Sequence, residues 1–103
     1  MSYRVEFLEL ALLDLSSIVS HITNELGMPM AAMNLAELIV REVDLLKEYP
    51  YSSAVYVPTR PLEHTFRRKV VQNYSVFYWI EEISKTVTVA RILYNKRDFM
   101  SLF

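Results

Sequence analysis

The sequence has no cysteine and only one glycine, Gly27, among its 103 residues. Without cysteine, the chain forms no disulfide, no Cys-ligated zinc site and no thiol nucleophile. A single glycine excludes the glycine-rich phosphate loops of the usual nucleotide cofactors. Histidine is scarce too, since only His21 and His64 occur and they lack the spacing of a zinc site. We therefore expect no metal and no cofactor.

Long apolar runs are also missing. No stretch reaches the roughly 18 consecutive apolar residues of a membrane span. The N-terminal residues lack the basic start and cleavage site of a signal peptide. Hydrophobic residues nevertheless make up 52% of the chain, which is enough apolar surface to offset the entropy lost on folding. These features predict a cytoplasmic protein that folds as one domain, residues 1–103, with no membrane association.

Charge is distributed unevenly although the formal net charge is only −1. Residues 1–50 contain three Lys/Arg and eight Asp/Glu, whereas residues 51–103 contain eight and four. A basic half predicts a surface that faces anions. That anion could be a nucleic acid, an acidic protein segment or the acidic half of the same fold, and composition leaves all three open.

The N-terminal half reads as a strand followed by a helix hairpin. Apolar and polar residues alternate over residues 2–8, as in a half-buried strand. From Glu9 the apolar spacing changes to three or four residues, which predicts amphipathic helices over 9–26 and 29–48. Gly27 suits the left-handed end of the first helix and Pro29 the first turn of the second. So short a connection makes the two helices antiparallel.

Three methionines lie partly off the apolar stripe of the second helix. They are Met28, Met30 and Met33. Methionine is flexible enough either to fill irregular gaps in a core or to form an adaptable surface for a partner. Of these two interpretations, the sequence favours gap filling.

The C-terminal half reads as a three-stranded meander. Alternation of β-branched or aromatic with polar residues runs from Tyr74 to Glu81 and from Thr86 to Tyr94, after a basic first strand that starts at Arg67. The intervening turns are short, which makes neighbouring strands antiparallel. Residues 51–64 are predicted to be a loop or irregular edge segment, and residues 97–103 a terminal helical turn that packs Phe99 and Leu102. The predicted fold is α+β: an N-terminal strand, an antiparallel helix hairpin and a three-stranded antiparallel meander forming one sheet, with the hairpin on one face.

Basic and aromatic side chains are concentrated around this meander. Alternation along a strand places Arg67 and Lys69 on one face and Arg68 on the other. Arg91 is expected to share a face with Val87, Val89 and Leu93. An arginine in an apolar strand is costly to bury alone, so Arg91 must reach a carboxylate or point into a cleft. The complete set is His64, Arg67, Arg68, Lys69, Arg91, Tyr94, Lys96 and Arg97.

The ordered segments ALLDLSSIVSHI, Pro29-x-x-Ala32-x-x-Leu35, RRKVVQNYSVFYWI and VTVARILYNKRD resemble the RelE/ParE superfamily of bacterial type II toxins over nearly the whole chain. The resemblance implies a small cytoplasmic toxin that is neutralised by an antitoxin encoded beside it. Two activities occur on this fold. RelE-like toxins cut messenger RNA on the ribosome without metal, and ParE-like toxins poison DNA gyrase.

The resemblance also implies roles for individual residues. Arg67 and Arg97 would hold and neutralise a phosphate, and Tyr94 would stack on a base or handle a proton. Supporting anion contacts would come from His64, Arg68, Lys69, Arg91 and Lys96. Tyr94 stands where many relatives have His, and the aromatic residues near the chain end, Phe99 and Phe103, have no proton to give.

The resulting functional prediction is a ribosome-dependent mRNA endoribonuclease whose partners are a cognate antitoxin, the ribosome and mRNA. The alternatives are a DNA gyrase inhibitor without chemistry and a degenerate toxin that acts only as an interaction module. For the endoribonuclease, we expect Arg67 and Arg97 to converge on one anion site, with Tyr94 close by.

Overall fold

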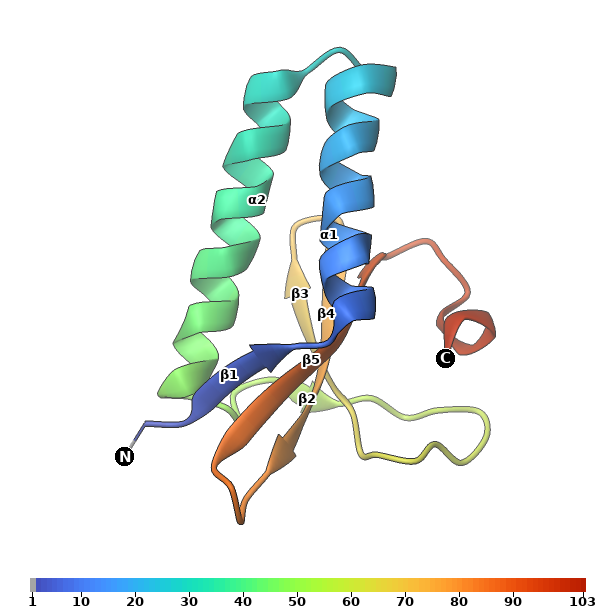
Figure 1. Cartoon of the computed structure of the whole chain (residues 1–103). Helices are drawn as coiled ribbons and strands as arrows, with labels where there is room; N and C mark the ends of the chain where they lie inside the picture. The colour runs from blue at the N-terminus through green and yellow to red at the C-terminus, as the bar shows by residue number, and fades with distance from the viewer. Residues whose placement is uncertain (1) are drawn as a thin grey trace.

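The computed structural model describes residues 2–103 and contains a helix hairpin packed on one face of a sheet (Figure 1). The helical elements are α1 (Glu9–Ser20) with a π-helical turn (His21–Glu25), α2 (Pro29–Asp44) with a 3-10 turn (Leu45–Lys47), and a C-terminal 3-10 turn (Phe99–Leu102). The strands are β1 (Arg4–Phe7), β2 (Ala54–Val55), β3 (Arg67–Val71), β4 (Tyr74–Glu81) and β5 (Thr86–Tyr94), in the spatial order β1-β5-β4-β3-β2. The predicted α+β class is confirmed.

The sheet is mixed rather than purely antiparallel. Strands β3, β4 and β5 form the predicted antiparallel meander. β1, however, pairs with β5 in parallel, from Arg4 opposite Thr86 to Phe7 opposite Val89. Alternating burial is the same in parallel and antiparallel strands, and no tight turn joins β1 to β5, so the sequence pattern carried no information on this direction. β2 adds a fifth, two-residue strand within the segment predicted as a loop or edge.

The helix hairpin forms as predicted. Gly27 ends the first helical segment with a φ of 63°, a left-handed conformation that suits glycine. The apolar stripe of α2, made up of Ala32, Leu35, Ile39 and Val43, is buried. The three methionines do not fill gaps, because Met28, Met30 and Met33 are each more than half exposed. Gap filling was therefore the wrong interpretation, since these side chains are solvent-exposed at the start of α2.

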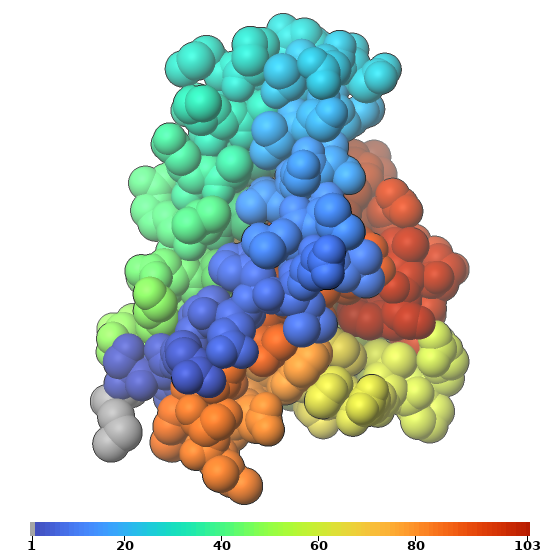
Figure 2. Space-filling view, in the orientation of Figure 1, coloured from blue at the N-terminus to red at the C-terminus, as the bar shows by residue number. Residues whose placement is uncertain are grey.

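Apolar side chains cover both faces of the sheet. On the helix face, Val76, Tyr78, Val87 and Ile92 pack with the residues of α2 and with Leu46. On the opposite face, a second cluster is formed by Phe66, Phe77, Ala90 and Leu93 and is covered by Phe99, Leu102 and Phe103. The predicted packing of the C-terminal turn is thus confirmed, and Figure 2 shows the C-terminal residues against the segment that precedes β3.

A β-bulge shifts the alternation in β5. Phe77 pairs with Arg91 but its neighbour Tyr78 pairs with Val89, which leaves Ala90 as the extra residue. Beyond the bulge, residues change faces, so Arg91 pairs opposite Phe77 and Leu93 joins the second cluster, whereas Val89 stays in the helix-side core. The expectation that Arg91 shares a face with Val87 and Val89 is wrong for this reason.

Candidate functional site

A groove of 660 Å³ lies between the helix hairpin and the end of the sheet where β3 turns into β4 and β5 ends. The helices supply a largely apolar wall, and the sheet supplies a polar one. The helix residues are Ser17, Ile18, His21, Ile22, Leu26, Ala31 and Leu35; the sheet-side residues are Gln72, Asn73, Tyr74, Tyr94 and Arg97. Of the residues predicted from sequence for an anion site, this groove contains Tyr94 and Arg97.

Two tyrosines lie side by side on the sheet side of the groove. Tyr74 and Tyr94 are directly opposite on β4 and β5, and their rings are tilted by 60° with centroids 5.6 Å apart. Burial raises the pKa of Tyr74, and the neighbouring Tyr94 raises it further. The phenol of Tyr74 therefore stays protonated at neutral pH, when it can donate a hydrogen bond but carries no charge.

Asn95 fixes the turn that carries Tyr94 and Arg97. Its backbone N–H donates to the carbonyl of Asn73 at 2.8 Å, and its side-chain amide donates to the carbonyl of Gln72 at 3.1 Å. Its side-chain oxygen accepts from the hydroxyl of Ser75 at 2.5 Å. The end of β5 is thus tied to the β3–β4 turn. Asn95 was not selected from the sequence, although an asparagine directly after a strand often hydrogen-bonds to nearby backbone groups.

Arg91 is held by a carboxylate rather than pointing into a cleft. Its Nε and one terminal nitrogen donate to Asp14 of α1 at 2.8 and 2.9 Å, and both side chains are only 13% exposed. Asp14 also accepts the backbone N–H of Ile92 at 3.0 Å. The other terminal nitrogen of Arg91 donates to the carbonyl of Leu102 at 2.5 Å. The hydrogen bonds to Asp14 raise the pKa of Arg91, and together these contacts hold α1, β5 and the C-terminal turn in place.

The structure does not bring Arg67 to Arg97. Arg67 starts β3 opposite Tyr78, whereas Val71, which ends β3, lies opposite Tyr74 at the groove. Four strand residues separate Arg67 from that end, or roughly 13 Å of sheet. Its guanidinium instead donates to the carbonyl of Ser53 at 2.7 Å. The predicted convergence is therefore wrong, because the register places Arg67 level with Val89 in the middle of β5, whereas Arg97 lies beyond the end of β5 at Tyr94.

The remaining predicted residues are dispersed. Arg68 donates to the hydroxyl of Ser75 at 2.7 Å and lies over the ring of Phe99. His64 stacks on Trp79, with ring centroids 3.7 Å apart. Lys69 is partly exposed in β3, and Lys96 is exposed next to Arg97. The basic residues thus form no single patch, and only Arg97 among them lines the groove.

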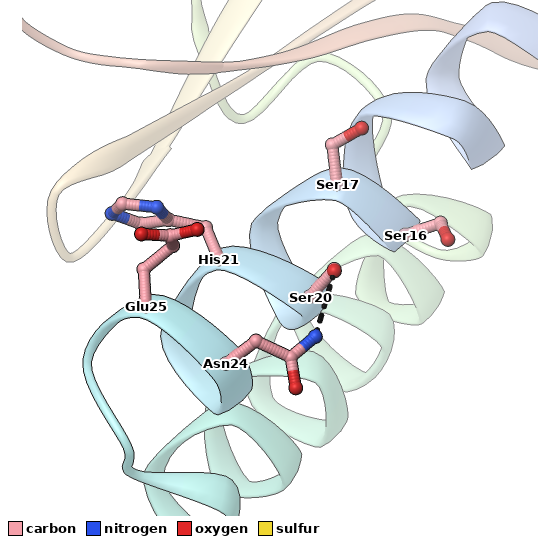
Figure 3. Close-up of a pocket in the computed structure, with 6 residues that line it drawn as sticks. All are labelled: Ser16, Ser17, Ser20, His21, Asn24 and Glu25. Atoms are coloured by element: carbon pink, nitrogen blue, oxygen red, sulfur yellow. Dashed lines mark hydrogen bonds between the residues drawn. The ribbon is translucent and has the colours of Figure 1, made fainter.

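His21 contributes an imidazole that was not selected from sequence. It starts the π-helical turn at the end of α1 and lines both the groove and an adjoining polar hollow. Figure 3 shows this hollow, where Asn24 donates to the hydroxyl of Ser20 at 3.2 Å and His21 and Glu25 project from the same turn. His21 is exposed at the end of α1, and its proximity to the end of β5 depends on tertiary packing that the sequence does not display.

Metal and membrane sites are not evident in the part of the chain that the structure describes. Within residues 2–103, no three His, Cys, Asp or Glu side chains cluster as a metal site would require. None of the helices in that range has both the length and the apolar character to cross a membrane.

Comparison with known proteins identifies the family. The model of the ParE toxin of the parDE type II toxin-antitoxin system matches residues 5–99. No curated protein matches the sequence. Similar solved structures include the chromosomal ParDE system from P. aeruginosa, with 20% identity, coverage of 90% of this chain and 96% of that chain, and a TM-score of 0.72.

Two RelE structures show the same fold. A double arginine mutant of the E. coli toxin RelE in the free state is 15% identical, with coverage of 99% of this chain and 93% of that chain and a TM-score of 0.67. The RelE–RelB complex from Pyrococcus horikoshii is 18% identical, with coverage of 94% and 99% and a TM-score of 0.62. The fold is thus that of the RelE/ParE toxins, as the sequence predicted. The chain belongs to the ParE toxin family of type II toxin-antitoxin systems, because that family's model spans most of it.

Proposed function

We propose that this toxin is a RelE-like, ribosome-dependent mRNA endoribonuclease that acts through the groove of Tyr94 and Arg97. The observation that supports this activity is the presence of a phenol and a guanidinium on one fixed turn beside a second tyrosine. Metal-independent RNA cleavage requires little more than orientation of the RNA, stabilisation of charge on the phosphate and transfer of two protons.

Each side chain has a role in this reaction. The ribose 2′-hydroxyl attacks the adjacent phosphorus, which gives a 2′,3′-cyclic phosphate and a 5′-hydroxyl end. The guanidinium of Arg97 stabilises the negative charge that builds up on the phosphate oxygens. Tyr74 provides an aromatic face on which an unstacked base can lie, and Tyr94 provides a phenol that can handle a proton.

We also propose a cognate antitoxin as the partner of this chain. Structurally similar toxins occur in complexes, namely ParDE of P. aeruginosa and RelE–RelB of P. horikoshii. On this chain, exposed Met30 and Met33 of α2 and Leu10 and Leu13 of α1 present the kind of apolar surface that a partner covers.

A second candidate is inhibition of DNA gyrase by binding alone. The observation that favours it is that the guanidiniums of Arg67, Arg68 and Arg91 are all engaged within the molecule. Few cations then remain to hold RNA, because phosphate contacts by Lys and Arg supply most non-specific nucleic-acid affinity. A binding inhibitor needs no catalytic group.

Induced expression with two readouts separates these functions. For the endoribonuclease, we expect cuts within translated messenger RNA, their loss in Arg97→Ala at unchanged melting temperature, and restored growth when the neighbouring gene is co-expressed. Arg41→Ala is a matched control, because Arg41 is an exposed arginine of α2 away from the groove. Gyrase-linked DNA breaks without RNA cuts would support the second candidate, and the absence of both would leave an interaction module.

A further inference from the structure

The groove contains one imidazole, and the chemistry proposed for it lacks one proton carrier. Tyr74 and Tyr94 supply phenols, which at neutral pH can give a proton but are already protonated and so cannot serve as the base. The aromatic residues near the chain end, Phe99 and Phe103, have no proton to exchange and pack against the sheet. His64 stacks on Trp79 outside the groove. His21 is therefore the only histidine among the residues that line the groove.

The backbone around His21 departs from regular helix at this point. α1 ends at Ser20, and residues His21–Glu25 form a π-helical turn. The N–H of Leu26 donates to the carbonyl of His21 at 3.2 Å, and the N–H of Met28 to that of Ile22 at 3.0 Å. Such turns are rare and are frequently located at functional sites. Here the turn buries Ile22 in the core while the adjacent His21 stays exposed at the groove.

The imidazole of His21 is available for a ligand. It is exposed and takes part in none of the side-chain hydrogen bonds or ion pairs formed by residues 2–103. The titratable groups around it are Glu25 on its own turn and Tyr74, Tyr94 and Arg97 on the sheet side, since α2 contributes only Ala31 and Leu35 to the groove. An imidazole exchanges a proton near neutral pH, which a phenol or a guanidinium does not.

We propose that His21 is a catalytic residue of this groove, the base that takes the proton of the attacking 2′-hydroxyl; this inference rests on the proposed endoribonuclease activity. The 2′ oxygen bonds to phosphorus as its proton passes to the imidazole. The bond from phosphorus to the 5′ oxygen breaks, and that oxygen takes a proton from the phenol of Tyr94. The imidazolium then returns its proton through solvent to the phenolate, which restores both groups.

The positions of His21 and Tyr94 suit their roles as base and acid. His21 comes from the helix side of the groove and Tyr94 from the sheet side. In an in-line displacement the attacking and leaving oxygens lie on opposite sides of the phosphorus, so a base and an acid on opposite walls can serve one each.

The test compares His21→Gln with the wild-type toxin in single-turnover cleavage of mRNA on programmed ribosomes, across pH 5–9. We expect His21→Gln to cut about 10²- to 10⁴-fold more slowly and to lose the limb of the pH profile that reports the base. Asn24→Ala is the matched control, because Asn24 lies in the same π-helical turn and lines the hollow but not the groove. Equal rates and pH profiles for wild type and His21→Gln would overturn the inference.

A second measurement uses the wild-type chain, so it does not depend on whether the variant folds. Uridine 3′-monophosphate is titrated while the imidazole resonance of His21 is followed by NMR. A shift that is lost in Arg97→Ala supports the site, and no shift at millimolar nucleotide contradicts it. Failure of the proposed function would look different, because the wild-type toxin would then leave mRNA intact on the ribosome.

Discussion

At the scale of single residues, Arg91 shows how a charge is accommodated in a buried strand. Its guanidinium forms two hydrogen bonds to Asp14 and a third to the carbonyl of Leu102. Asp14 in turn accepts the N–H of Ile92, just beyond the point where β1 stops pairing with β5. The carboxylate therefore accepts a backbone N–H that a neighbouring strand would otherwise accept at this edge, and it also neutralises the arginine.

Removing one member of this pair should destabilise the fold. For Asp14→Ala we expect the free energy of unfolding to fall by about 3 kcal/mol, because a largely buried guanidinium and a backbone N–H lose their acceptor. Arg4→Ala is the matched control, since the Arg4–Glu6 pair is exposed, at 66% and 55%, and should change stability by less than about 1 kcal/mol. Urea unfolding of both variants measures the difference, and similar losses would contradict the role given to Asp14.

The residue types in the sequence predicted which chemical groups interact more reliably than they predicted where those groups lie in the fold. The alternatives for Arg91 followed from the cost of burying a charge, and a carboxylate is what the structure contains. Its face was wrong because a bulge at Ala90 leaves no signature in the apolar pattern. Arg67 was misplaced because strand register decides how far along the sheet a residue lies. His21 was missed because its contact with the groove joins segments distant in sequence.

At the scale of elements, the local signals were reliable. Both helices and the three meander strands lie close to where the apolar period changes, since that period follows directly from helix and strand geometry. The parallel pairing of β1 and the two-residue strand β2 were not predicted. Each depends on a neighbour in space rather than on a pattern within the segment itself.

The connection between the helices offers a test of one such local signal. Gly27 has a φ of 63°, and a Cβ placed there would meet no atom within 4 Å. Gly27→Ala should therefore cost about 1 to 2 kcal/mol from backbone strain alone. Gly27→Asn should cost less, because asparagine tolerates the left-handed region better. Urea midpoints of the two variants measure this order, and an alanine variant as stable as wild type would contradict it.

At the scale of the whole molecule, Glu82 joins the β4–β5 turn to two segments that are distant in sequence. Its carboxylate accepts hydrogen bonds from Tyr3 just before β1, from Tyr51 after α2 and from Lys85 in the β4–β5 turn. The hydrogen bonds from Lys85, Tyr51 and Tyr3, in that order of effect, lower the pKa of Glu82 to about 2. The hydrogen bond to Glu82 also raises the pKa of Tyr51, so that phenol stays a donor.

The lowered pKa of Glu82 in the folded state makes the stability of the fold depend on pH under acidic conditions. A carboxyl with a lower pKa in the folded state stabilises the fold above its unfolded value of 4.5, and this contribution disappears as the pH falls from 4.5 toward about 2. Over that range the melting temperature of wild type should fall more steeply than that of Glu82→Gln. Glu81→Gln, at an exposed neighbouring position, should behave like wild type. Equal slopes of melting temperature against pH for wild type and Glu82→Gln would contradict this contribution.

The pairing of β1 with β5 sets when this chain can fold during its synthesis. Arg4 cannot pair until its partner Thr86 has been synthesised. At about 5 to 20 residues per second, a ribosome needs roughly 4 to 16 s to make the residues between them. Until then the N-terminal strand has no partner, β5 does not exist, and the groove lacks Tyr94 and Arg97. A nascent chain of this topology therefore lacks its complete sheet and its groove for nearly the whole of its translation, and both form only once β5 has been made and pairs with β1.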